Sequence, residues 1–429
     1  MKKTFSIILA ALIVFCLAAC SSEKTREKAE GFVPRLDKST ECKISIVGTY
    51  SNFEALEAEF DRFNEYYPNV EMSYTKIDDY NKSIATVLSG NDAPNIFFSF
   101  SWMTGNSAYD SVFAHMENLA DASLGLDLNC IRPGLLNRDS QGRVLTVPIF
   151  STSYGMLINN DLFEKEGLKV PSTLSELFKV CAAFKEKGYE SPMMGYSKDS
   201  SGCLMNTVAY PVFAGTLAKN PEKVALANQC DPAAGEYMRT ALETLTQLIE
   251  KGCINIEKCD EIKDNYTAVI LRFFEGDVPM MICTGDTVSG TGKRESQSEA
   301  FTANPFSYSF TTVPTTEKGG YFLDSPSVQF SVNSACENLD MTNEFMRFLI
   351  TKAELNRMAS VKRLITPSND LSFDKVYTPV GNVSSDLIIS PTSLGIEDTL
   401  AVQIRLASYR VGKGTLTIDE AVAQYGSFK

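Results

Sequence analysis

The stretch that decides the fold is VPIFSTSYGMLINNDLFEKEGLKVPSTLSELFKVCAAFKEKG, residues 147–188. An apolar run closed by Pro148 leads into a short β-like segment, residues 156–158, which ends at two asparagines. A helix is predicted directly after it, with Asn160 or Asp161 as its N-cap and Gly167 as the left-handed residue beyond its end.

A second helix is predicted after Pro171. Ser172 or Thr173 is placed to cap it, and Glu176 stands where it would complete a capping box with Thr173. The apolar residues of this segment keep a helical period until Gly188 ends it. They are Leu174, Leu177, Val180, Cys181 and Phe184.

This stretch resembles the bacterial extracellular solute-binding proteins of family 1, the maltose and oligosaccharide type that feeds ABC importers. The family's motifs occur in order as Val147-Pro148, INNDLF at 158–163, Gly167-Leu168 and PSTLSEL at 171–177. The resemblance implies an α/β, two-lobed, periplasmic-binding-protein-like fold. Each lobe would be a mostly parallel sheet flanked by helices, and a hinge would join the lobes with the ligand cleft between them.

The start of the chain is typical of an exported lipoprotein. Lys2 and Lys3 precede an apolar run that is too short for a comfortable membrane span, so residues 1–19 are predicted to be a signal peptide. The LAAC sequence at 17–20 resembles a lipobox, which makes Cys20 the expected lipidation site; an ordinary signal peptide with an incidental cysteine is the alternative. Residues 20–41 are then the lipidated N-terminus and a flexible tether, and the protein is expected on the extracytoplasmic face of the cell membrane.

Length and charge limit the remaining possibilities. The 429 residues allow two domains of ordinary size. The net charge is −13, and it becomes −15 when the signal peptide leaves with its two lysines. This excess of acidic groups argues against nucleic acid or a polyanion as the main partner, although a local basic pocket stays possible.

Nine cysteines remain after the signal peptide and Cys20 are set aside, and an odd number cannot all form disulfides. We interpret most of them as buried small apolar residues rather than a disulfide framework; the spacing of Cys253 and Cys259 allows at most one local disulfide. No CxxC pair or Cys/His cluster offers a metal site, and no cofactor is expected. The nine are Cys42, Cys130, Cys181, Cys203, Cys230, Cys253, Cys259, Cys283 and Cys336.

The first lobe is predicted to begin with a βαβ unit, made of a strand at 43–48, a helix at 53–63 and a strand at 70–75. Ligands of parallel sheets bind beyond the carboxyl ends of the strands, so the loops at 49–52 and 99–103 are expected at the cleft. They supply the candidate ligand residues Tyr50, Asn52, Ser101 and Trp102.

Trp102 is the only tryptophan in the chain. A sugar ring offers an apolar face surrounded by hydroxyl groups, so its site needs flat aromatic side chains and planar polar groups. We therefore interpret Trp102 as a cleft residue, with a structural tryptophan packed in a lobe as the alternative. Tyr50 and Tyr154 are also interpreted as cleft residues, with ordinary surface-loop tyrosines as the alternative.

The second lobe contributes Tyr154, Tyr210 and Asp286 to the predicted site. Residues 206–217 resemble a family helix with ligand contacts, and FEGDVPMM at 274–281 resembles a family strand that returns to the cleft. The family usually has an aromatic residue after the next glycine, whereas this chain has Asp286. Asp286 would bind a sugar hydroxyl or be a simple turn residue, and residues 288–298 are predicted to be a mobile rim loop.

The closing segment, from residue 308, resembles the family's last signature, with a turn at Gly319-Gly320 and a returning strand at 329–332. This implies that Phe322 and Asp324 lie near the hinge and cleft. The predicted lobes are residues 42–150 with 324–367, and residues 151–323 with 368–429.

The sequence thus predicts a monomeric, lipid-anchored protein that closes on an oligosaccharide and delivers it to ABC importer permease subunits. A peptide, polyol or other small polar solute is not excluded, and a surface glycan-capture or sensor protein of the same fold is the alternative function. An exported carbohydrate-active enzyme is a further alternative, but His115 is the only histidine and no GxSxG motif occurs. Pairs of carboxylates are unavoidable among 53 acidic residues and indicate nothing.

Overall fold

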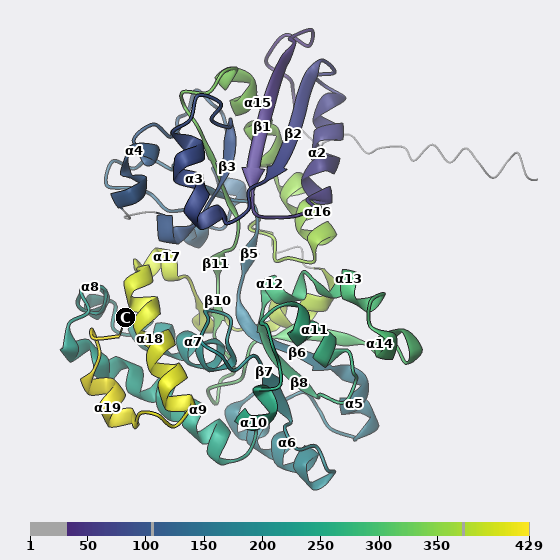
Figure 1. Cartoon of the computed structure of the whole chain (residues 1–429), viewed down its shortest axis with the longest axis vertical. Helices are drawn as coiled ribbons and strands as arrows, with labels where there is room; N and C mark the ends of the chain where they lie inside the picture. The colour runs from purple at the N-terminus through teal and green to yellow at the C-terminus, as the bar shows by residue number, and fades with distance from the viewer. Residues whose placement is uncertain (1–31, 104–106, 371–373, 429) are drawn as a thin grey trace, which may run out of the picture. The chain divides into compact units, whose positions relative to one another are not determined.

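The computed structural model describes residues 32–103, 107–370 and 374–428 (Figure 1). The chain divides into two compact units, residues 1–33 and 34–429, and every helix and strand below belongs to the second. The predicted signal peptide and Cys20 lie outside the described residues. Part of the predicted tether is not free, because the backbone N–H of Arg35 donates to Glu344 Oε1 at 2.8 Å and that of Leu36 donates to the Tyr67 hydroxyl at 3.1 Å.

The first sheet has five strands in the order β2-β1-β3-β12-β4. β1 pairs in parallel with β2 and β3, whereas β12 is antiparallel to β3 and β4. The helix between β1 and β2 confirms the predicted βαβ unit. The bounds are β1 (Cys42–Gly48), α2 (Glu54–Asn64), β2 (Val70–Lys76), β3 (Ile96–Ser99), β4 (Val147–Pro148) and β12 (Gln329–Val332).

Four longer helices accompany this sheet: α2, α3 (Tyr80–Leu88), α15 (Leu339–Leu349) and α16 (Lys352–Lys362) (Figure 1). α16 and α15 both pack on α2. The aromatic side chains of Phe53, Phe63 and Phe98 are completely buried here. Burial of each such side chain stabilises the fold by roughly 2–3 kcal/mol, which fixes the strand ends that carry the cleft loops.

The second sheet has the order β7-β8-β6-β9 and corrects the prediction of mostly parallel sheets. β6 is antiparallel to both β8 and β9, and only β7 pairs in parallel with β8. The cause is chain direction: β6 leads away from the first sheet, and β8 returns to the start of β6, where Gly285 N–H donates to Ser153 O at 2.9 Å. The bounds are β6 (Tyr154–Asn159), β7 (Met193–Gly195), β8 (Met280–Thr284) and β9 (Tyr308–Thr311).

The two helices of the opening stretch form as predicted, with corrected caps. α5 (Asn160–Lys165) is capped by Asn159, whose side chain accepts from Leu162 N–H at 3.1 Å, and not by either of its two successors. α6 (Leu174–Glu186) is capped by Thr173, but the carboxylate of Glu176 accepts from Ser172 N–H, so the predicted capping box is only half formed. Gly167 and Gly188 both have the expected positive φ, +69° and +93°.

Further helices pack beside the second sheet. α7 contacts α9 and α18, and η7 (Lys375–Asn382) packs on β9. The short helix α8 lies between α7 and α9, and its Val224 and Ala227 are buried. The bounds are α7 (Leu204–Ala218), α8 (Val224–Asn228), α9 (Arg239–Glu250), α11 (Thr267–Phe273), α17 (Pro391–Leu394), α18 (Asp398–Gly412) and α19 (Ile418–Ala423).

Three chain segments connect the two sheets. β5 (Ser151–Thr152) follows β4, and β11 (Ser325–Pro326) precedes β12; these two short strands pair antiparallel. The third segment follows α16, where Ile365 forms a β-bridge with Ser151. We call these three segments the hinge segments.

The nine cysteines among the described residues are free, and six of them are buried. The local disulfide suggested between Cys253 and Cys259 does not form, because the thiol of Cys253 instead contacts that of Cys181 on α6. In the described part of the chain, no helix combines the length and apolar character needed to cross a membrane.

Candidate functional site

A cavity of about 980 Å³ lies at the carboxyl end of β1, and we call it the first cavity. The loop after β1 forms one wall with Tyr50 and Asn52. The hinge residues Thr152 and Ser327 form its base. Further lining comes from Tyr266 before α11, from α12 (Gly285–Val288) and from α13 (Thr291–Glu295), and the end of α16 lines the cavity beside Tyr50. The predicted residues Tyr50, Asn52 and Asp286 are thus brought together.

Tyr50 is held firmly in this wall. Its backbone N–H donates to the Tyr74 hydroxyl at 2.9 Å, and its ring meets Phe53 edge-on at 5.0 Å between centroids. The ammonium of Lys362 lies 4.9 Å from the ring centroid, within the range of a cation–π contact. Burial, and then the nearby Asp286, raise the pKa of Tyr50 well above its usual value, so its hydroxyl keeps a proton to donate to a ligand.

Asp286 is the second residue of α12, and hydroxyl groups of the hinge hold it in place. Ser327 Oγ donates to Asp286 Oδ1 at 2.5 Å, and Asp286 N–H donates to Thr152 Oγ1 at 3.2 Å. Among the described residues, no cation lies within 4 Å of its carboxyl group. The pKa of Asp286 is raised overall, because burial raises it more than the hydrogen bonds to Ser327 and Thr152 lower it. A carboxyl group in this position can accept or share hydrogen bonds with a polar ligand.

A second cavity, of about 560 Å³, lies beside the first, and Pro326 of β11 lines both. Ser101 and Trp102, from the loop after β3, face Glu397 and Asp398 at the start of α18. Trp102 also packs on its neighbours, stacked on Phe100 at 6.0 Å. Trp102 therefore combines both predicted roles, because it rests on other rings and lines a cavity while half-buried.

The other four predicted residues do not line these two cavities. Tyr154 and Tyr210 meet edge-to-face with centroids 5.5 Å apart, and Tyr210 is only 7% exposed. Burial, followed by the charge of Asp286, raises the pKa of Tyr154. Phe322 is buried in the core, and both oxygens of Asp324 are held by Arg132.

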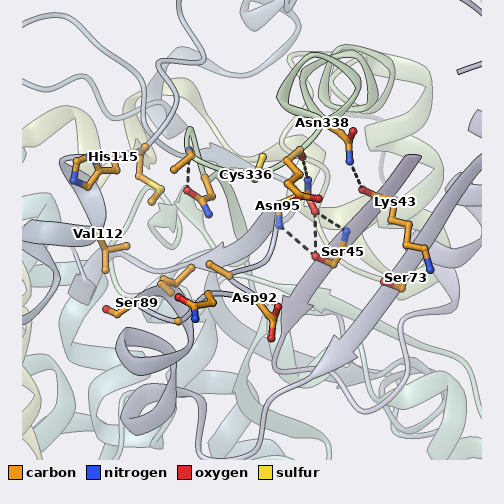
Figure 2. Close-up of a pocket in the computed structure, with 18 of the residues that line it drawn as sticks. Lys43, Ser45, Ser73, Ser89, Asp92, Asn95, Val112, His115, Cys336 and Asn338 are labelled. Atoms are coloured by element: carbon orange, nitrogen blue, oxygen red, sulfur yellow. Dashed lines mark hydrogen bonds between the residues drawn. The ribbon is translucent and has the colours of Figure 1, made fainter. Parts of the chain in front are cut away.

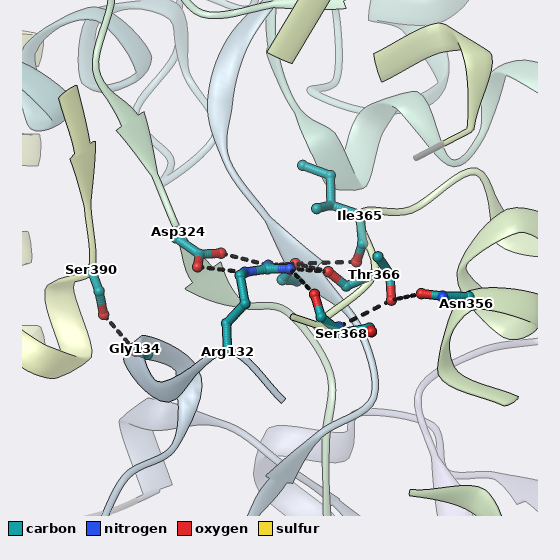
Figure 3. Close-up of polar contacts among 9 residues, drawn as sticks. Arg132, Gly134, Asp324, Asn356, Ile365, Thr366, Ser368 and Ser390 are labelled. Atoms are coloured by element: carbon teal, nitrogen blue, oxygen red, sulfur yellow. Dashed lines mark hydrogen bonds and ion pairs between the residues drawn. The ribbon is translucent and has the colours of Figure 1, made fainter. Parts of the chain in front are cut away.

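Arg132 connects all three hinge segments (Figure 3). Its Nε and Nη2 each donate to one carboxylate oxygen of Asp324 at 2.7 Å, and Nη2 also donates to Ser151 Oγ at 2.7 Å. Its Nη1 donates to the carbonyl oxygens of Thr366 and Ser368, at 2.6 and 2.9 Å. All five N–H donors of the guanidinium are therefore used. This side chain fixes the hinge segments to one another beside both cavities.

A cavity of about 880 Å³ lies elsewhere, near the amino ends of β1 and β3 (Figure 2). Its central polar residue, Asn95, already has partners: its Oδ1 accepts from Ser45 N–H at 3.0 Å, and its Nδ2 donates to Glu337 O at 2.8 Å and Thr342 Oγ1 at 3.0 Å. Its amide thus both accepts and donates hydrogen bonds within the fold. Because its polar groups serve the fold, we do not place the ligand site here.

Several cavity residues were not predicted from the sequence. Tyr266, Lys293 and Lys362 line the first cavity, and Asp398 lines the second. Residues 288–298, expected to be a mobile loop, instead form helical turns, with Val288 and Thr291 buried. These turns were not predicted because the Gly/Ser-rich composition of residues 288–298 is typical of a loop. Arg132 gave no local signal, because all its acceptors are distant in sequence except Ser151, nineteen residues away.

The family model described as bacterial extracellular solute-binding protein matches residues 48–355. The chain belongs to this family. The melibiose/raffinose/stachyose-binding protein MelE of Bacillus subtilis is 24% identical over 263 residues, which are 60% of this chain and 58% of MelE. The match thus spans little more than half the length of that relative. The family and this relative are described as solute-binding proteins and not as enzymes.

Solved structures of solute-binding proteins share its fold. The apo form of RafE from Streptococcus pneumoniae has a TM-score of 0.69 at 16% identity, covering 91% of this chain and 97% of RafE. The GacH receptor of Streptomyces glaucescens has a TM-score of 0.65 at 17% identity, with the same two coverages. The two-lobed α/β fold predicted from the sequence is confirmed, apart from the strand directions of the second sheet.

Proposed function

We propose that this solute-binding protein captures an oligosaccharide at the two cavities beside the hinge. One observation carries the proposal: Pro326 joins a cavity containing Tyr50 and Asp286 to a cavity containing Trp102 and Asp398. Aromatic faces and carboxyl groups are what sugar rings and hydroxyls require. Two adjoining cavities also suit a ligand of more than one ring. RafE in complex with raffinose, and the name of MelE, support a sugar of this kind.

Binding would act by shifting a population of open and closed states. Tyr50, Asn52 and Trp102 follow strands of the first sheet, whereas Asp286 and Asp398 belong to elements packed with the second. A ligand that touches both groups only in the closed state favours that state by its extra contacts. In this proposal the lobes are residues 42–150 with 324–367, and residues 151–323 with 368–429.

The proposal includes the cellular context. Cys20 carries the lipid anchor after residues 1–19 are removed, the monomeric protein lies on the extracytoplasmic face of the membrane, and the closed form docks on the permease subunits of an ABC importer. The family description, which names extracellular solute-binding proteins, supports this setting. Metabolic labelling with a fatty-acid analogue tests it: label is expected on the native protein and not on a Cys20→Ala variant, and label on both would place the anchor elsewhere.

The sugar proposal is tested with the only tryptophan as a probe. Melibiose, raffinose, stachyose and linear glucose oligomers up to heptasaccharides are titrated while Trp102 emission and the melting temperature are followed. A saturable emission change with a raised melting temperature is expected for at least one sugar. Trp102→Phe is the control, because it keeps a ring against Phe100 but removes the emission. No melting shift with any sugar would contradict the proposed function.

A further inference from the structure

The first cavity carries an excess of positive charge, although the chain as a whole is strongly acidic. Its acidic lining residues are Glu54 and Asp286, and its basic ones are Lys293, Arg294, Lys362 and Arg363. The second cavity has the opposite character, with Glu397 and Asp398 and no basic residue among its lining. The two ends of the proposed site therefore differ in charge.

Two of the four cations are already engaged. Arg363 Nη1 lies 2.6 Å from Glu295 Oε1 and also donates to the Tyr308 hydroxyl. Lys362 Nζ lies 3.9 Å from Glu54 Oε2, which is a long ion pair. Burial lowers the pKa of Lys362, and the positive charge of Lys293 lowers it further. The two ammonium groups therefore repel each other.

Lys293 and Arg294 have no such partner. Among the described residues, no carboxylate oxygen lies within 4 Å of either side chain, although the chain has 53 acidic and only 40 basic residues. The Arg294 guanidinium covers the Tyr266 ring at 5.2 Å and donates to Thr267 Oγ1 at 3.1 Å, while its Nε is buried without a partner. Lys293 is exposed at the cavity wall.

Asp286 does not supply the missing negative charge. It lies in the same cavity, but no cation of the described chain is within 4 Å of it, and its hydrogen bonds go to hinge hydroxyl groups. The cavity thus holds two cations without a counter-ion, next to Tyr266, a ring that is 37% exposed. An exposed aromatic face with neighbouring free cations matches a sugar ring that bears one anionic substituent.

We propose that the ligand is an acidic oligosaccharide, whose single carboxylate or sulfate group binds Lys293 and Arg294 while its ring lies against Tyr266. The inference rests on the proposed function and adds the substrate class. One anionic group per ligand is compatible with the overall charge, whereas a polyanion would be repelled by the rest of the surface and by Glu397 and Asp398 in the adjoining cavity.

The test compares ligands that differ only in charge. The full chain without its first twenty residues is titrated calorimetrically with two pairs of ligands. One pair is glucuronic-acid-substituted xylo-oligosaccharides and the same compounds after reduction of the carboxylate to a primary alcohol; the other is sulfated galacto-oligosaccharides and their unsulfated counterparts. At least one acidic compound is expected to bind about tenfold tighter than its neutral counterpart, and this preference is expected to shrink with added salt.

Variants locate the effect. Lys293→Gln is expected to remove the preference for the acidic compound, which means that it lowers affinity for the acidic compound about tenfold more than affinity for the neutral counterpart. Lys169→Gln is the matched control, an exposed lysine outside both cavities, and is expected to change neither. Because Lys293 is exposed, this substitution does not endanger folding.

The outcomes separate the two proposals. Equal affinity for acidic and neutral compounds, or an acidic preference that survives Lys293→Gln, overturns the substrate class and leaves the sugar-binding function standing. Binding of neither acidic nor neutral sugars overturns the proposed function itself. A preference confined to the sulfated compounds identifies sulfate rather than carboxylate as the anionic group and supports the inference.

Discussion

Replacement of Arg132 by methionine tests whether one side chain holds the hinge segments together. The substitution removes five hydrogen bonds and leaves the Asp324 carboxylate, which is only 4% exposed, without its cation. Breaking a buried ion pair on one side typically costs about 3–5 kcal/mol, because the remaining charge stays buried and unpaired. We expect a loss of this size in the free energy of unfolding.

The free energy of unfolding of Arg132→Lys is expected to lie between that of Arg132→Met and that of the native chain. A lysine keeps the charge but has three donors on one atom, which cannot reach the carboxylate, Ser151 and both carbonyl groups in the geometry of a planar guanidinium. Asp324→Asn combined with Arg132→Met should recover about half of the loss, since the unpaired charge is then gone.

Urea unfolding followed by circular dichroism and by Trp102 emission measures these values. Arg138→Met is the matched control, because Arg138 is exposed and donates only to Gly142 O at 3.1 Å; its expected effect is below about 0.5 kcal/mol. An Arg132→Met variant that loses less than about 1 kcal/mol would refute the reasoning, since the network would then contribute no more than an exposed ion pair.

Three further predictions follow from other contacts. Glu59 is completely buried, and burial followed by the contact with Glu354 raises its pKa to about 9, so the native state holds a proton that the unfolded state releases above pH 4.5. The stability linked to Glu59 is therefore present at acid pH and is lost as the pH rises towards 9. Glu59→Gln should remove this loss, so that the variant is more stable than the native chain by about 2 kcal/mol at pH 8 and differs little from it at pH 4.5. Parallel pH profiles of the unfolding free energy of the two proteins would contradict this. Trp102→Ala should weaken sugar affinity about tenfold with a smaller effect on folding, and a stably folded variant with native affinity would remove Trp102 from the site. Gly155→Ala should cost about 2–3 kcal/mol, because its Cβ would lie 2.3 Å from Thr311 O between β6 and β9; a melting temperature within one degree of native would show that the strands separate freely.

Local signals in the sequence were sufficient for the elements that frame the site. Alternation and helical spacing predicted β1, α2 and β2, and the glycines at 167 and 188 have the left-handed conformation that ends a helix. Because parallel strands end at one edge, the sequence also predicted which loops carry Tyr50 and Trp102. Each of these predictions depends only on residues that are close together in the sequence.

Features that depend on distant partners were not predictable. The direction of β6 relative to β8 depends on where the chain crosses the hinge. The cap of α5 depends on which side chain accepts from Leu162 N–H, and this is Asn159 rather than the expected Asn160 or Asp161. Asp324 was expected at the cleft because its position in the closing signature is near the hinge, but its partner Arg132 is 192 residues away. Charge accumulation in the first cavity likewise arises from α13 and α16, which are far apart in sequence.

The most direct test of ligand capture at the hinge is a crystal structure with the sugar that raises the melting temperature most. The account predicts sugar rings beside Pro326, with contacts to Tyr50 or Trp102 from one lobe and to Asp286 or Asp398 from the other. Electron density for the sugar only in the cavity around Asn95, or on one lobe alone, would contradict it.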